Sequence, residues 1–137
     1  MGKLLKNNVT PEELEKLLET AWSRATSADP KGWNKTNPAW GQCAVTACVI
    51  QDHFGGTLLR VDAWIIGVGD PIGHYFNKLP DGTTVDLTRI QFPTDTIFSP
   101  PQERMRAYVL DPQFTTRHRY QLLKRRLRKI LKTQCPA

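Results

Sequence analysis

Residues 42 to 54 constrain the fold of this chain most strongly, because they predict a short apolar helix with glycine at each end. Gly41 precedes the segment, and Gly55-Gly56 ends it in the manner of a helix C-cap. The small side chains of Ala44 and Ala47 suit a helix that packs closely on its neighbours. We therefore expect this helix to be buried and the other elements to pack around it.

A cysteine stands at the start of this helix. Cys43 follows Gly41 and Gln42, so the chain turns and then presents a thiol at a helix N-terminus. Backbone N–H groups at this position stabilise a thiolate, and they can also hold the oxyanion of a tetrahedral intermediate. The alternative is a small core residue, which is the usual role of a helical cysteine. For Cys48, about 140° further round the helix, core packing is the better interpretation.

A predicted hairpin supplies a base for this thiol and a residue to orient the base. Pro80-Asp81-Gly82 predicts a turn between two strands. Pairing across the turn brings His74 and Asp86 together, and the alternation of each strand lets their side chains share a face. The alternatives are that His74 is a structural histidine and that Asp86 is a surface aspartate. Asn77 competes for the orienting role, but it belongs to the other face of the strand from His74.

Apolar spacing and turn residues predict the remaining elements. Thr10, Pro11 and Glu13 predict a helix start with a capping box, and the apolar stripe that follows ends near residues 27 to 30. We expect a final helix from about residue 115, and we read residues 92–114 as a loop with one short helix. The expected strands are 57–61, 64–68, 74–79 and 83–87.

Length and composition predict one domain with one core, since the chain has 137 residues of which 39% are hydrophobic. No run of about 18 apolar residues exists, and the apolar stretch in residues 1–8 is too short for a signal peptide. Cys43, Cys48 and Cys135 are an odd set without framework spacing, which predicts free thiols and a reducing compartment. These features favour a soluble cytoplasmic protein without a membrane span.

No cofactor is predicted, and the spacing of candidate ligands argues against a metal. Cys43, Cys48, His53 and His74 are the residue types of a zinc site. Separations of five residues scatter the first three around one helix, however, and the chain contains no Cys-x-x-Cys pair.

Positive charge is concentrated at the C-terminal end of the chain. The net charge is +6, and residues 112–137 hold eight Lys and Arg residues but no acid, which leaves 11 basic and 13 acidic residues before them. A helix here combines an apolar stripe with a basic face. It either docks with that face in solvent or binds nucleic acid or an acidic partner. The candidate contact residues are Arg117, Arg119, Lys124, Arg125 and Arg128.

Four segments carry a family resemblance, namely residues 37–43, 51–56, 74–82 and 85–92. Together they resemble the small bacterial YunG-like family, and the sequence around Gly41-Gln42-Cys43 looks like the nucleophile motif of transglutaminase-like enzymes in the papain-like superfamily. The likeness spans roughly residues 10 to 110. It implies an α+β, papain-like fold, in which N-terminal helices, one carrying the cysteine, pack on an antiparallel sheet that carries the histidine and the aspartate.

The chain departs from the resemblance at two points. Ala44 stands where an aromatic residue commonly follows the cysteine of the transglutaminase motif, and the basic helix lies outside the likeness. We accordingly divide the chain into a papain-like catalytic domain, residues 1–114, and a basic C-terminal helix, residues 115–137, that packs on this domain or extends from it.

The expected function is that of a cysteine enzyme which cleaves or transfers an amide or isopeptide acyl group through a Cys43 thioester. The substrate is a protein, a peptide or a small amide. His74 is the expected base, and Asp86 fixes its tautomer. The alternative is a non-catalytic module whose basic helix engages nucleic acid or an acidic partner. Candidates for the oxyanion site and the cleft are Gln42, Trp40, Asn77, Gln91 and Trp33.

Overall fold

The computed structural model describes residues 9–134 and shows a mixed α+β architecture. Two short 3-10 turns, η1 and η2, cover Arg24–Thr26 and Arg89–Gln91. The helices are α1 (Pro11–Ala21), α2 (Cys43–Phe54), α3 (Arg106–Val109) and α4 (Thr116–Gln134). The strands are β1 (Thr57–Trp64), β2 (Ile72–Lys78), β3 (Thr84–Val85), β4 (Ile97–Phe98) and β5 (Gln102–Arg104).

The strands form an antiparallel sheet in the order β3-β2-β1-β4, and β5 also pairs with β1. The long β1–β2 pair is its centre, and its register places Val61 opposite His74. The predicted hairpin is present as β2 and β3, with Asn77 opposite Val85. The expectation of an α+β fold with an antiparallel sheet is thereby confirmed.

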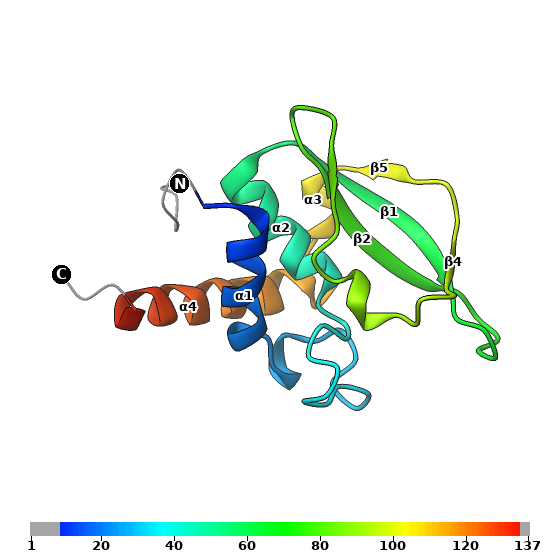
Figure 1. Cartoon of the computed structure of the whole chain (residues 1–137), viewed down its shortest axis with the longest axis horizontal. Coiled ribbons are helices and arrows are strands. Elements are labelled where there is room, and N and C mark those ends of the chain that lie inside the picture. Colours follow the sequence, from blue (N-terminus) through cyan, green and yellow to red (C-terminus); the bar gives the residue numbers. More distant parts are fainter. Residues whose placement is uncertain (1–8, 135–137) are drawn as a thin grey trace.

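Helix α2 lies at the centre of the core, as its composition predicts. Residues 44 to 50 are all buried, because α2 packs between the sheet and α4. Figure 1 shows α1, α2 and α4 gathered on one side of the sheet, with α2 next to the strands. Leu14 and Leu18 of α1 and Leu123 and Leu127 of α4 complete this core.

The face of the sheet away from α2 carries a second, aromatic cluster. Asn77 donates a hydrogen bond to the Ala47 carbonyl of α2, so its neighbour Phe76 and the alternate residue His74 point to the opposite face. Phe92 and Phe98 pack there against the His74 ring, at centroid distances of 5.0 and 5.9 Å. His74 is thus a buried residue with an aromatic environment.

The structure corrects three predictions of secondary structure. Helix α1 ends at Ala21, because Trp22 is extended and its indole donates to Thr46 in the core. Residues 64–68 are no separate strand, since β1 runs to Trp64 and a turn follows. The segment 92–114 holds two short strands besides its short helix, and these strands exist through pairing with β1, which local sequence does not reveal.

Helices α2 and α4 confirm the predicted helices at residues 42–54 and from about residue 115. Across residues 9–134 no helix has both the length and the apolar character that crossing a bilayer requires.

Candidate active site

The loop before α2 positions Cys43, and its conformation requires glycine at position 41. Gly41 has a φ of 75°, and its hypothetical Cβ would collide with Ser27 and with the backbone of Ala28. The Gly41 carbonyl accepts a hydrogen bond from the Ala28 N–H at 2.8 Å. Ser27 also donates to the carbonyl of Trp40. The turn is therefore clamped to the segment after α1, and the next residue but one begins α2.

Cys43 is the first residue of α2 and is partly exposed. The preceding residue, Gln42, makes no side-chain capping hydrogen bond. The first N–H groups of a helix have no acceptor within the helix, so this end of α2 presents donors and a partial positive charge beside the thiol. Cys43 Sγ lies 4.0 Å from the carbonyl oxygen of Gly73, the residue before His74.

His74 and Asp86 form a close pair. The Nε2 atom of His74 lies 2.7 Å from Oδ2 of Asp86, and the His74 side chain is almost fully buried. Asp86 follows β3 directly, so the β2–β3 hairpin positions both residues. Thr88 donates to the other carboxylate oxygen of Asp86 at 3.5 Å. The side chains that the sequence placed on neighbouring strands are therefore in contact.

The surroundings of His74 act on its pKa in opposite directions. Burial disfavours the imidazolium, whereas the hydrogen bond to Asp86 and the interaction with the Cys43 side chain favour it. The favourable contacts prevail and raise the pKa of His74 from 6.5 to about 9. Since Asp86 engages Nε2, the ring nitrogen available to Cys43 is Nδ1. This arrangement can exchange a proton between a thiol and a base.

Gln91 joins the nucleophile loop to the histidine. The side-chain oxygen Oε1 of Gln91 accepts a hydrogen bond from the Gly41 N–H at 3.1 Å, and the side-chain nitrogen Nε2 lies 3.5 Å from His74 Nδ1. Asn37 in turn donates to the backbone carbonyl of Gln91. From sequence, Gln91 was one cleft candidate among several. Its one distinguishing signal was its place in the segment 85–92 that also contains Asp86.

The other oxyanion and cleft candidates point elsewhere, which corrects those predictions. The Gln42 amide is buried and donates to the Ser23 carbonyl, and the Trp40 indole donates to Asp29. Asn77 lies against α2, and the Trp33 indole donates to the Pro38 carbonyl. Each of these polar groups helps to fix a loop or a helix and is not directed at Cys43.

A cavity of about 320 Å³ lies beside the His74–Asp86 pair. Its walls are mainly apolar and aromatic, with Phe76 and Phe98 on the sheet side. Arg89 also lines it, but the guanidinium donates to the carbonyls of Phe92, Pro93 and Thr94 and lies over the Phe98 ring. The Arg89 guanidinium is thus fixed by contacts within the protein.

The five basic candidates of α4 separate into two groups. Arg119 is buried and donates to the Thr26 carbonyl, and Lys124 is buried within 3.5 Å of Asp52, so neither is presented to a partner. This corrects the prediction for these two residues, which the sequence pattern alone could not distinguish from the others. Arg117, Arg125 and Arg128 are exposed.

The other two cysteines are not part of the candidate site. Cys48 is fully buried, and burial raises the pKa of its thiol to about 12. Cys135 lies outside the described residues. Within residues 9–134 no group of three or more His, Cys, Asp and Glu side chains is arranged to hold a metal ion.

Fold and site together define an α+β protein in which a cysteine at a helix N-terminus meets a histidine–aspartate pair from an antiparallel sheet. Residues 10–132 match the family model described as YunG protein, and the chain belongs to this family. This confirms the predicted YunG-like resemblance.

A relative in Bacillus subtilis (strain 168), described as "Uncharacterized protein YunG", is 38% identical to the chain over 81 residues. The match covers 59% of this chain and 62% of that protein, so the chain spans less than two thirds of the relative's length. No solved structure matches the chain.

Proposed function

We propose that the protein is a cysteine-dependent enzyme that hydrolyses or transfers the acyl group of an amide or isopeptide bond. The observation that carries the proposal is the buried His74 ring, which contacts Asp86 through one nitrogen and interacts with Cys43 at a helix N-terminus. Three residue types in this order form the nucleophile, the base and the orienting group of thiol enzymes.

The proposed reaction proceeds in two stages through a thioester. The Cys43 thiolate attacks the amide carbonyl carbon, and the N–H groups at the start of α2 stabilise the oxyanion that forms. The C–N bond breaks as the proton on His74 Nδ1 passes to the leaving amine, which leaves a thioester. Water or a second amine then gives a proton to His74 and attacks the thioester, and the Cys43 thiolate departs. Water gives hydrolysis, and an amine gives transfer.

A papain-like fold is part of this proposal. The support is a cysteine helix packed against an antiparallel sheet whose adjacent strand region carries the base and its partner. The thiol nucleophile and the buried Cys48 thiol also suit a reducing compartment, and we place the protein in the cytoplasm on this ground. The Gln91 amide nitrogen lies 3.5 Å from His74 Nδ1 and is a second candidate for the oxyanion donor.

The first test is the rate of iodoacetamide alkylation at each cysteine as a function of pH, read by peptide mass spectrometry. We expect Cys43 to react well below the ordinary thiol pKa of about 8.5. In His74→Ala this low-pH reaction slows by about tenfold or more, because the imidazolium no longer stabilises the thiolate. Cys48 is an internal reference and reacts slowly throughout, because its thiol is buried and its pKa is about 12.

An ordinary titration of Cys43 that His74→Ala leaves unchanged would contradict the proposal. An activated Cys43 justifies a screen of fluorogenic amides and of amide–amine pairs, with the thioester trapped by rapid acid quench and detected by mass. Cys43→Ser abolishes product in this screen and Cys48→Ser does not. Circular dichroism of each variant confirms that it is folded.

A further inference from the structure

A basic groove runs along the exposed side of α4, and it shares no lining residue with the Cys43 site. It encloses about 510 Å³, and five of its eight lining residues are cationic, while no carboxylate lines it. The lining side chains are Arg106, Leu110, Arg117, Tyr120, Gln121, Lys124, Arg125 and Arg128.

One carboxylate behind the groove neutralises part of this charge. Asp52 pairs with Arg106 at 2.7 Å and with Lys124 at 3.5 Å, and it also accepts from the Tyr120 hydroxyl. These side chains anchor α4 to α2. The ion pairs found within residues 9–134 include none to Arg117, Arg125 or Arg128, so an excess of positive charge faces solvent.

The exposed cations oppose folding electrostatically. Arg125 and Arg128 are three residues apart on one helix face, and like charges at this spacing destabilise a helix. Arg117 lies in the first turn of α4, which contains no acid, and a cation there is unfavourable beside the positive end of the helix dipole. The core contacts of α4 come from other residues, so packing does not require these arginines.

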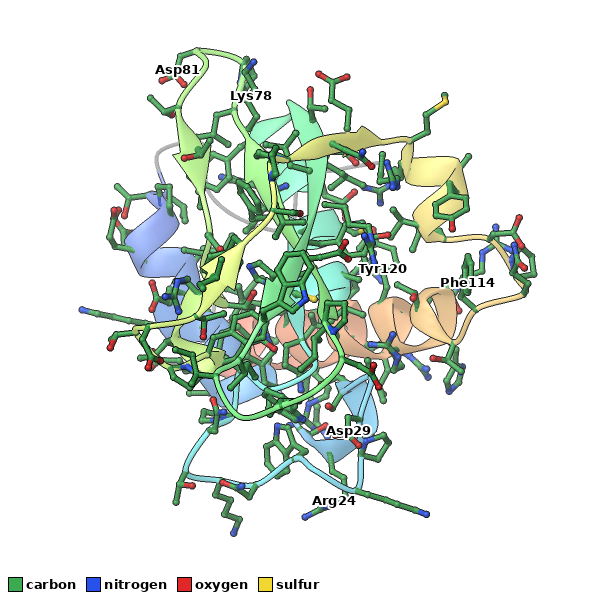
Figure 2. The ribbon with its side chains drawn as sticks, turned by 90° about the vertical axis from the view of Figure 1, so that its right-hand side faces the viewer. Arg24, Asp29, Lys78, Asp81, Phe114 and Tyr120 are labelled. Atoms are coloured by element: carbon green, nitrogen blue, oxygen red, sulfur yellow. The ribbon has the colours of Figure 1, made fainter. Side chains whose placement is uncertain are left out.

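An exposed aromatic pair belongs to the segment 106–117, in which Arg106, Leu110 and Arg117 line the groove. Tyr108 of α3 and Phe114, just before α4, pack edge to face at 5.5 Å, with 51% and 39% of their surfaces exposed. In Figure 2, Phe114 lies where the chain enters α4, and Tyr120 lies further along between α4 and α2. Arg106 and Leu110 of the groove flank Tyr108 in the chain, and Arg117 follows Phe114 by three residues.

We infer that this face binds single-stranded nucleic acid without sequence preference. The phosphates lie along Arg117, Arg125 and Arg128, and one or two bases stack on Tyr108 and Phe114. The inference does not rest on the proposed thiol chemistry, because no residue of the Cys43 site takes part.

The shape and composition of the surface favour this ligand over an acidic polypeptide. The arginines extend along α4 for roughly 16 Å at 1.5 Å per residue, which suits a row of phosphates better than a single anion. Proteins that bind single strands without sequence preference combine such a basic track with exposed aromatic rings. An acidic polypeptide would use the cations but would leave the aromatic pair without a flat partner.

The test is the fluorescence anisotropy of labelled oligo-dT and oligo-U, each of about 16 nucleotides, with the full-length protein between about 50 and 200 mM salt. Arg125→Ala with Arg128→Ala weakens binding by about tenfold at the lower salt and reduces the slope of log affinity against log salt by about 1.4. Phe114→Ala weakens binding by about fivefold or more and leaves the slope unchanged, since stacking releases no counterions.

The matched control is Lys129→Ala with Lys132→Ala, which removes the same charge from exposed positions that do not line the groove. Binding of this variant stays within about twofold of the wild type. Equal weakening by both charge pairs would overturn the site. Absence of binding at the lower salt, a duplex bound at least as tightly as the single strand, or equally effective competition by polyglutamate would overturn the ligand. Thermal unfolding shows that each variant is folded.

Discussion

His74 is the residue at which the separate parts of the candidate site meet. Its ring contacts Asp86 from the hairpin, interacts with Cys43 from α2 and lies 3.5 Å from the Gln91 amide. Two of these contacts favour the imidazolium, and an amide N–H directed at Nδ1 favours the neutral ring. The ring is therefore poised by opposing contacts, which suits a group that gives and takes one proton.

Substitutions at Gln91 test this balance. In Gln91→Ala the neutral ring loses a donor, so the pKa of His74 rises by up to about one unit. In Gln91→Glu a carboxylate accepts from the imidazolium and the increase is larger. The measurement is the titration of the His74 ring protons by NMR, together with the pH profile of Cys43 alkylation.

The same two variants separate a role in tautomer control from a role in loop packing. Glutamate keeps an acceptor for the Gly41 N–H, so the Cys43 loop retains its geometry in Gln91→Glu while the His74 titration moves. Equal His74 titrations in both variants and the wild type would show that Gln91 acts on the loop alone.

At the scale of elements, α4 is part of the core as well as a carrier of charge. Leu123 and Leu127 are buried against α1 and α2, and Arg126 donates to the Ala21 carbonyl at the end of α1. Removal of α4 would open this core, so point substitutions rather than truncation separate the function of the helix from its contribution to stability.

Leu127→Ala measures the contribution of α4 to the core. Leu127 is 1% exposed, and truncation of a buried leucine lowers the free energy of unfolding by about 2–5 kcal/mol. Urea denaturation followed by circular dichroism provides the measurement. Arg128→Ala is the neighbouring control and changes stability by about 0.5 kcal/mol or less, because its side chain is exposed. A comparable loss in both variants would mean that α4 does not pack as a core helix.

At the scale of the whole molecule, the candidate site couples proton binding to folding. The pKa of His74 is about 9 in the folded protein and 6.5 for the ordinary side chain, so the folded state holds this proton more tightly. The resulting stabilisation is fully present below pH 6.5 and is lost as the pH rises through about 9.

We therefore expect the free energy of unfolding of the wild type to fall between pH 6.5 and about 9. In Asp86→Asn the fall is smaller and ends at a lower pH, because the acceptor that favours the imidazolium is weakened. Urea denaturation at a series of pH values is the measurement, and the slope against pH is independent of any uniform loss of stability in the variant. Parallel profiles for the two proteins would assign the pH dependence to another group.

Elements with strong local signals were predicted from sequence. The capping box at Thr10 and Glu13, the glycines around α2 and the Pro80-Asp81-Gly82 turn each act within a few residues, so α1, α2 and the hairpin were found. The two-residue strand β4 and the three-residue strand β5 were missed, because their hydrogen bonds come from β1, more than 30 residues away.

The sequence by itself determined which residue types could do chemistry and which local frame carries them, because helix caps, turns and strand alternation depend on neighbouring residues. It placed Cys43 at a helix start and His74 and Asp86 on one hairpin. Tertiary structure alone decided which polar side chains face the site, because burial and hydrogen bonding are settled between distant segments. It turned Gln42 and Asn77 into the interior, brought Gln91 to the imidazole and separated the arginines that anchor α4 from those that face solvent.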